Sequence, residues 1–223
     1  MPEGKPHDLR HIVILANPNL GSFSHAMAEA YCAAVADCGQ TAVIRDLYAL
    51  RFNPLLQASE LPPSPSPPAA DVAAELDVLR DAAVIVFVYP LWFGMPPAII
   101  KGYVDRVLGA GFSGRDMLAG TRPSVIQGKR LISFSTSAST RPWIEERGQW
   151  IALRQGIDSY LAAVFGLIDA GHSHFDAIVA PLSERYAREC LLEVGEQARQ
   201  VSATILSERH ARQLLAYRQR ARS

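Results

Sequence analysis

Short apolar runs that alternate with helical segments constrain the fold of this chain more than any other feature of its sequence. The predicted strands are 11–16, 41–47, 82–89, 130–136 and a fifth within 166–178; the predicted helices are 22–38, 71–82, 98–108, 151–166 and 184–217. Gly39 is well placed to end the first helix. Strands that alternate with helices imply a parallel sheet covered on both faces through right-handed crossovers.

Five such strands fit an α/β fold with a flavodoxin-like, doubly wound five-stranded parallel sheet in the order 2-1-3-4-5. In that order the ligand crevice lies beyond the carboxyl ends of strands 1 and 3. We expect residues 1–223 to form a single domain, because α/β folds of this length commonly share one core. The Pro/Ser-rich segment 57–70, "QASELPPSPSPPAA", is interpreted as a surface excursion, neither helix nor strand. A domain linker is the alternative, but the chain before it is short for a separate domain.

Charge and cysteine content exclude several classes of partner. Lys and Arg number 22, as do Asp and Glu, so the formal net charge is zero and argues against binding to nucleic acid or an anionic membrane. The polar start "MPEGKPHDLR" does not resemble a signal or transit peptide, and no apolar stretch approaches the roughly 20 residues of a membrane span. Cys32, Cys38 and Cys190 lack C-x-x-C spacing, so we interpret them as reduced thiols in a cytoplasmic protein.

The loop after the first strand, "ANPNLGSFSHAM", is a candidate anion site. If the helix begins near Ser22, its free N–H groups and positive dipole end face the crevice. Ser22 and Ser24 add hydroxyl groups, and Asn17 adds an amide. None of these is a strong acid or base, so the loop fits a phosphate that stays bound. The alternative is an N-cap serine among ordinary loop residues.

The loop after the third strand places two large aromatic residues where water can reach them. Pro90 ends the strand, Leu91, Trp92 and Phe93 follow, and two further prolines begin the next helix. A hydrophobic lid is one interpretation; a pre-set aromatic wall for a planar ligand, with backbone N–H groups at its edge, is the other. After the fourth strand, "STSAS" offers small residues and hydroxyls that allow close approach of a ligand, or forms an ordinary polar turn.

Together the three loops call for a ligand with a phosphate at one end and a planar heterocycle at the other. A flavin nucleotide fits this description better than a bare nucleotide. A flavin also explains why no catalytic dyad is evident, because the cofactor carries the reactivity.

The segments "VILANPNLGSFSHAMAEA", "DLYALRFNPLL" and "YPLWFGMPPAIIKGYVDRVL", taken together, resemble the NAD(P)H:quinone oxidoreductases of flavodoxin-like fold. The likeness runs in order from residue 12 to about residue 112 and weakens afterwards. It implies a homodimer with sites at the subunit interface, bound FAD or alternatively FMN, and NAD(P)H as co-substrate. It also implies two-electron reduction of a quinone by a ping-pong mechanism through the flavin.

The resemblance also assigns residues. Those matched to the family's cofactor-binding loops are Ser22, Phe23 and Ser24 for the phosphate, Leu91, Trp92 and Phe93 for the isoalloxazine ring, and Thr136, Ser137 and Ala138 for its polar edge, with Asn17 and Pro90 beside them. Asn17 replaces a histidine common in the family, and Ser137 and Ala138 replace two glycines. Trp143 and Gln149 stand where mammalian members carry a tyrosine and a histidine, and neither donates a proton at neutral pH. Phe112 and Trp143 are the residues expected against the substrate, whose identity stays open.

Two other functions remain possible from the sequence. Some relatives of this family are accessory subunits of potassium-efflux systems, in which contacts of the flavin fold matter more than turnover. A one-electron carrier of the flavodoxin type is the third option, but such carriers are strongly acidic. His172 and His174 could be metal ligands at strand spacing, yet no cysteine or larger acidic cluster accompanies them, so we predict a loop or strand-end role and no metal. The arginines of "RHARQLLAYRQRARS" are interpreted as the end of a helix, not a nucleic-acid tail.

Overall fold

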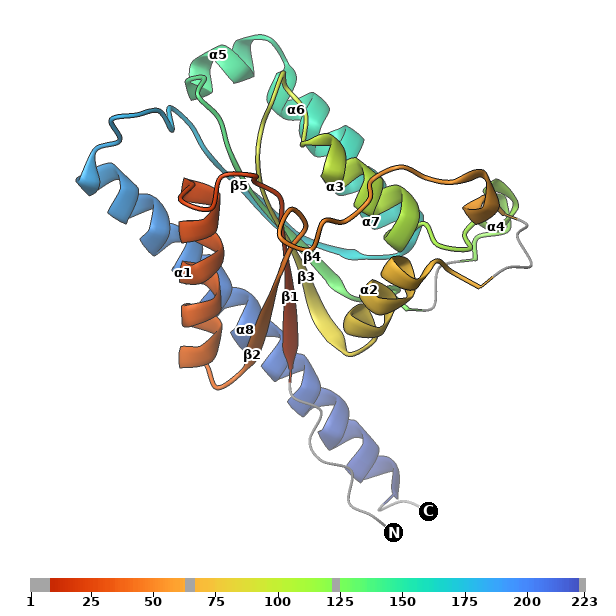
Figure 1. Ribbon diagram of the computed structural model, residues 1–223. Helices are drawn as coiled ribbons and strands as arrows, with labels where there is room; N and C mark the ends of the chain where they lie inside the picture. Colours follow the sequence, from red (N-terminus) through yellow and green to blue (C-terminus); the bar gives the residue numbers. More distant parts are fainter. Residues whose placement is uncertain (1–8, 63–66, 122–124, 221–223) are drawn as a thin grey trace.

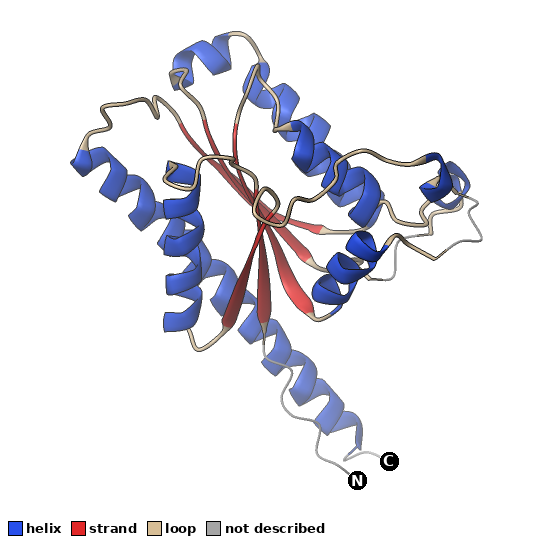
Figure 2. Ribbon diagram, viewed as in Figure 1, coloured by secondary structure: helices blue, strands red, loops and turns tan. Residues whose placement is uncertain are grey.

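A five-stranded parallel sheet organises the chain in the computed structural model, which describes residues 9–62, 67–121 and 125–220. The strands are β1 (Arg10–Leu15), β2 (Thr41–Asp46), β3 (Ala82–Pro90), β4 (Arg130–Thr136) and β5 (Ile168–Phe175). Their order is β2-β1-β3-β4-β5, which confirms the predicted topology (Figures 1 and 2). Pro90 is the last residue of β3, where it lies opposite Thr136, so the strand ends one residue later than predicted.

Alternating side chains of the two central strands build two cores. On one face Ile12 and Ile14 of β1 pack with Phe87 of β3, and on the other Val13 and Val86 lie at the centre. This alternation follows from the two-residue period of a strand. Because both faces are apolar, β1 and β3 read in the sequence as continuous apolar runs.

Helices cover each face of the sheet, as Figure 1 shows. α1 (Phe23–Asp37) and α8 (Glu184–Arg220) lie on one face. α2 (Ala70–Arg80), α3 (Ala98–Tyr103) and α7 (Tyr160–Phe165) lie on the other. α1 ends before Gly39, whose φ of +69° is the left-handed conformation expected after a helix.

Several helical segments differ from the predictions. The helix predicted at 98–108 continues from α3 as a π-helix, η2 (Val104–Leu108). The region predicted at 151–166 starts earlier, as α6 (Gln149–Leu153), and reaches α7 through a second π-helix, η3 (Arg154–Ser159). Two short helices, α4 (Gly114–Leu118) and α5 (Arg141–Glu146), were not predicted, because each is too short to show a helical period.

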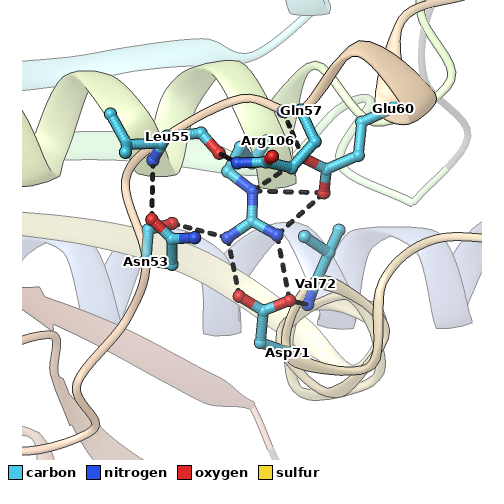
Figure 3. A network of polar contacts seen from close by, with 7 residues as sticks. All are labelled: Asn53, Leu55, Gln57, Glu60, Asp71, Val72 and Arg106. Carbon is cyan, nitrogen blue, oxygen red and sulfur yellow. Dashed lines mark hydrogen bonds and ion pairs between the residues drawn. The ribbon is translucent and has the colours of Figure 1, made fainter.

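The segment that precedes α2 is held against η2 by one buried arginine. Arg106 is 4% exposed and forms ion pairs with Glu60 at 2.8 Å and Asp71 at 2.6 Å, and it also donates to the Asn53 carbonyl (Figure 3). Residues 58–60 form a 3-10 helix, η1 (Ala58–Glu60), so the prediction that 57–70 contains no helix is wrong at that turn; residues 63–66 lie outside the described residues. Arg106 holds the excursion in place because it binds Asp71 and Glu60, which precede it in the sequence by 35 and 46 residues.

Gly102 lets the chain just before the excursion, at Pro54, pass close to α3. A Cβ atom placed on Gly102 would lie 2.4 Å from Cα and the carbonyl oxygen of Pro54. Only a residue without a side chain fits that approach.

Within the described residues, no helix is long and apolar enough to span a membrane. Cys32, Cys38 and Cys190 are all free thiols, as predicted. Residues 1–8 of the N-terminal segment "MPEGKPHDLR", in which no targeting signal was expected, lie outside the described residues. The basic C-terminal segment belongs to α8 as far as Arg220, which confirms the helical interpretation.

Candidate active site

The loop between β1 and α1 is wound by two asparagine side chains. Asn17 Oδ1 accepts the N–H of Asn19 at 3.0 Å, and Asn19 Oδ1 accepts the N–H of Gly21 at 3.1 Å. Asparagine commonly forms such turns, in which its side chain accepts the backbone N–H two residues further on. They bring the chain to Ser22, which stands at the N-cap of α1.

The N-terminus of α1 is not capped by the Ser22 side chain. The Ser22 hydroxyl instead lies 2.9 Å from His25 Nδ1, and His25 Nε2 lies 3.2 Å from Asp46 Oδ2 of β2. Ser24 is buried, and its hydroxyl oxygen accepts a hydrogen bond from the Asn17 amide at 3.2 Å. The first turn of a 15-residue helix therefore keeps its positive end without a side-chain cap.

Trp92 and Phe93 are exposed on the loop after β3. Trp92 is 42% exposed and Phe93 is 107% exposed, so the side chain of Phe93 is in water. Phe93 also has a φ of +51°, a conformation that is strained for a residue with a bulky side chain. These side chains do not belong to the buried core of the chain.

The backbone of this second loop is held on both sides. Leu91 N–H donates to the Thr136 carbonyl at 2.6 Å, and Trp92 and Met95 exchange two backbone hydrogen bonds at 3.0 and 3.1 Å. The N–H groups of Leu91 and Trp92 are thus engaged within the protein, and they do not point to a ligand edge as the sequence had led us to expect. A Cβ placed on Gly94 would lie 2.1 Å from Gln149 Nε2, so the Gln149 amide packs directly on the loop.

The loop after β4 continues from the same edge of the sheet. Thr136 and Ser137 are buried, and Ala138 is exposed. Ser137 N–H donates to the Phe175 carbonyl of β5 at 3.1 Å, and its hydroxyl lies 3.0 Å from the Ser139 carbonyl and 3.1 Å from His174 Nε2. These bonds fix the backbone of the loop although the glycines expected there are replaced.

The three loops leave the carboxyl ends of β1, β3 and β4, which are neighbours in the sheet (Figure 1). Their backbones are tied by the hydrogen bonds from Ala16 N–H to the Val88 carbonyl and from Leu91 N–H to the Thr136 carbonyl. A helix N-terminus, an exposed aromatic pair and a small polar loop thus meet along one edge. This set suits a ligand that carries a phosphate and a planar ring.

The two residues expected against a substrate are not brought together within one chain. Phe112 packs edge-on against Phe165 at 5.8 Å, and it lines a cavity of about 680 Å³ beside α3 and α7. Trp143 is 46% exposed on α5, where the Arg147 guanidinium lies 4.5 Å from its ring centre. In Figure 1, α5 and the segment leading to α4 lie at opposite ends of the molecule.

A buried polar cluster that the sequence did not predict lies beside the third loop. His172 and His174 lie in the second half of β5, and Ser135 lies within 2.7 and 2.8 Å of one nitrogen of each ring. Asp158 of η3 contacts His172 at 2.7 Å. A loop or strand-end position was predicted for the two histidines. Their partners could not be predicted, because these come from segments far apart in the sequence. The spacing of two residues indicated only that both rings lie on the same face of a strand.

Comparison with known proteins places the fold in a family. Residues 10–198 match a family described as having a flavodoxin-like fold. The chain is 31% identical over 200 residues to an uncharacterised NAD(P)H oxidoreductase of Haemophilus influenzae, which covers 89% of this chain and 98% of that protein. It is 32% identical over 149 residues to NAD(P)H dehydrogenase [quinone] 1 of Rattus norvegicus, covering 58% of this chain and 54%, about half, of the rat enzyme.

Solved structures agree with this fold. The NAD(P)H:quinone oxidoreductase of Methanothermobacter marburgensis superposes with a TM-score of 0.74 at 23% identity, covering 87% of this chain and 96% of that one. An FMN-dependent NADH-azoreductase of Bacillus anthracis, solved with FMN, superposes with a TM-score of 0.64 at 14% identity, covering 86% and 99%.

Proposed function

This chain belongs to the flavodoxin-like family of NAD(P)H:quinone oxidoreductases, and on that premise we propose that it is a flavin-dependent NAD(P)H oxidoreductase. Its acceptor is a quinone or a similar small molecule, reduced in a ping-pong reaction. The relatives support the oxidoreductase class through their names, and the azoreductase structure with FMN supports a flavin in this fold.

The observation that carries the proposal is the exposed aromatic pair on a restrained loop. Trp92 and Phe93 stand in water at the carboxyl end of β3, next to a helix N-terminus that lacks a side-chain cap. A planar ring that stacks on these side chains would bury them, and a phosphate of the same ligand would meet the positive end of α1.

The three loops have separate tasks in this proposal. Phe23 N–H and its neighbours in the first turn of α1, with the Ser22 and Ser24 hydroxyls and Asn17 beside them, would hold the flavin phosphate. Pro90, Leu91, Trp92 and Phe93 would orient the ring and exclude water from one of its faces. Thr136, Ser137 and Ala138 would contact its polar edge. When bound, FMN or FAD would supply the two-electron hydride-transfer chemistry between the nicotinamide and the acceptor.

The proposal is tested first by turnover. The purified chain, supplied with FMN or FAD, should oxidise NADH or NADPH when menadione is the acceptor. A flavin-bound chain that shows no acceptor-dependent oxidation with either nicotinamide would favour an accessory subunit or a carrier instead.

The phosphate assignment is tested by binding. The double variant Ser22→Ala with Ser24→Ala should weaken binding of the preferred flavin by about 1–3 kcal/mol, because two hydrogen bonds to a charged group are lost. The matched control is Ser207→Ala on the exposed side of α8. Quenching of flavin fluorescence measures both, and equal affinity of the double variant and the control would contradict the assignment.

We also propose a homodimer that completes the substrate side of the site. Large apolar side chains around the 680 Å³ cavity are exposed, among them Leu61 (53%), Met95 (54%), Met117 (44%) and Tyr160 (54%). Met117 lies in the segment after η2, whereas Leu61 and Met95 precede α3 and Tyr160 belongs to α7; on α3 itself only Ala98 and Lys101 are exposed. A second copy on this face would cover them and could bring its own Phe112 towards the aromatic pair. Sedimentation that shows only a 24 kDa species at micromolar concentration would contradict the dimer.

A further inference from the structure

A continuous chain of hydrogen bonds runs through the protein beneath the loop that follows β4. Asp158 Oδ2 lies 2.7 Å from His172 Nδ1, and His172 Nε2 lies 2.7 Å from the Ser135 hydroxyl. The Ser135 hydroxyl lies 2.8 Å from His174 Nδ1, and His174 Nε2 lies 3.1 Å from the Ser137 hydroxyl. Four contacts therefore connect a buried carboxylate to the loop 136–138.

A bulge in β5 puts the two histidines into this chain. Leu131 of β4 lies opposite Asp169, but Ser133 lies opposite His172, so β5 contains one extra residue between these pairs. Gly171, with a φ of +115°, stands at that point. Without the extra residue the two imidazoles would point to the other face of the sheet, because neighbouring side chains of a strand alternate.

The chemistry of the groups allows one uniform direction of donation when both imidazoles are neutral. The Asp158 carboxylate also receives the Ser133 hydroxyl at 2.9 Å, and an ionised carboxylate can only accept. His172 must then carry its proton on Nδ1, so its Nε2 accepts from Ser135. Ser135 in turn accepts from His174 Nδ1–H, and His174 Nε2 accepts from the Ser137 hydroxyl. Every hydrogen bond points towards Asp158.

One added proton reverses the direction and still satisfies every group. His172 as an imidazolium donates from Nε2 to Ser135, Ser135 donates to His174 Nδ1, and His174 donates from Nε2 to Ser137. The Ser137 hydroxyl then donates to the Ser139 carbonyl, which lies at 3.0 Å. That carbonyl also accepts the Ala177 N–H at 3.0 Å, so it keeps a partner in both arrangements.

We infer that these five side chains form a proton relay that takes up or releases one proton at the Ser137 hydroxyl. On uptake, the incoming proton binds Ser137 Oγ while the Ser137 proton moves to His174 Nε2. The Nδ1 proton of His174 moves to Ser135, and the Ser135 proton moves to His172, where it is held beside Asp158. Release is the same series in reverse. The role of the relay at the flavin's polar edge rests on the proposed function, but the relay itself does not.

The surroundings of the two histidines suit different roles: His174 passes the proton on, and His172 holds it. Burial, reinforced by the nearby His172, lowers the pKa of His174 to about 4, whereas Asp176 opposes this shift and Arg141 adds to it. His174 therefore stays uncharged over the working range. The Trp150 ring stands 5.0 Å from the His172 ring and 5.7 Å from the His174 ring and covers both.

The remaining groups that face the relay come from β3, η3 and β5. Tyr89 of β3 lies edge-on to His172 at 6.1 Å, and burial followed by the charge of Asp158 raises its pKa well above the ordinary value, so it stays neutral. The Arg154 guanidinium lies 3.4 Å from Asp158 and 3.1 Å from Asp169, so its positive charge is shared between the two carboxylates.

The relay predicts a signature that no merely structural histidine shows. In the full-length protein labelled with ¹⁵N-histidine, two-bond proton–nitrogen spectra should place the proton of neutral His174 on Nδ1. As the pH is lowered, this proton should switch to Nε2 in the same transition in which His172 becomes doubly protonated. Single His172→Gln and His174→Gln variants assign the signals. A His174 that keeps one tautomer throughout this transition would overturn the relay.

Removal of the central hydroxyl tests the connection. Ser135→Ala should abolish the tautomer switch of His174, whereas Ser173→Ala, on the opposite face of β5, should leave it intact. If Ser135→Ala does not fold, Ser137→Ala serves the same purpose, because it removes the group that His174 Nε2 meets. A switch that survives both serine substitutions in the relay would refute the assignment.

Addition of FMN or FAD separates the relay from the proposed function. A flavin whose polar ring edge lies against the third loop should move the midpoint of the switch, because a hydrogen bond to the Ser137 hydroxyl favours one direction of the relay. If the switch exists but neither flavin binds, the relay stands and the proposed function fails. If a flavin binds without moving the midpoint, the relay does not serve the bound cofactor and that part of the inference is wrong.

Discussion

Phe93 gives the sharpest test of the proposed site. In the flavin-free protein its backbone conformation is strained and its apolar side chain is exposed to water, so neither feature stabilises the fold. The side chain is 107% exposed, so its removal loses no burial. Its φ of +51° lies in the left-handed region, which costs an L-residue about 1–2 kcal/mol. Strain of this kind concentrates at functional sites, where the position of the side chain matters more than its stability.

Phe93→Gly should therefore stabilise the flavin-free protein and weaken flavin binding at once. Relief of the left-handed strain, less the roughly 0.5–1 kcal/mol that glycine costs in chain entropy, leaves a gain between about 0 and 1.5 kcal/mol, with a central value of about 0.75 kcal/mol. For a chain of this size the central value raises Tm by roughly 1.5–3 °C. Loss of a stacked ring should weaken flavin binding by about 1–3 kcal/mol, which is roughly 5–150-fold in Kd.

Arg51→Gly is the matched control. Arg51 is exposed and has a φ of +52°, and it lies in the turn after β2, outside the sequence of the three loops. Glycine there should give a similar rise in Tm and an unchanged flavin Kd. Thermal unfolding of the flavin-free proteins and fluorescence titration with FMN and FAD measure the two quantities.

Two results would refute the reasoning. A loss of more than about 1 kcal/mol of stability in Phe93→Gly would mean that the ring packs on protein and relieves no strain. An unchanged flavin Kd would remove Phe93 from the site. If a second copy covers the ring, sedimentation of the variant should shift towards the monomer, and the gain in Tm should be absent.

Further predictions concern the clamp on the excursion before α2. Arg106→Met should lower the free energy of unfolding by about 3 kcal/mol, because it leaves the 13%-exposed Glu60 carboxylate without its partner. Arg80→Met, at an exposed ion pair, is the control and should lower it by less than about 1 kcal/mol, both measured by urea unfolding. Arg106 hydrogen bonds lower the pKa of both Glu60 and Asp71. The stability difference between parent and Arg106→Met should therefore be complete above about pH 5 and shrink as the pH falls through the lowered pKa values; an equal difference at pH 3 and pH 7 would contradict this. Gly102→Ala should displace the backbone at Pro54 and lower Tm, and an unchanged Tm would show that the backbone yields without cost.

Local sequence patterns were enough to predict the sheet and the three loops at its carboxyl edge. The apolar runs that became β1 and β3 are continuous because both faces are covered, and the helices between them carry their own end signals, such as Gly39. The exposure of Trp92 was also evident, because prolines on both sides of the loop keep it out of the strand and the helix. These features depend on residues close together in the chain.

The relay and the clamp depended on contacts that no local pattern encodes. Asp158 and His172 are 14 residues apart, Ser135 and His172 are 37, and Arg106 and Glu60 are 46. Whether His172 meets Ser135 or points to the opposite face is decided by one extra residue in β5 at Gly171. The sequence determines which segments become strands, because backbone preference and burial act over a few residues. Only the packed sheet decides the register between β4 and β5, because a slip of one residue leaves each strand intact and reverses every side chain on it.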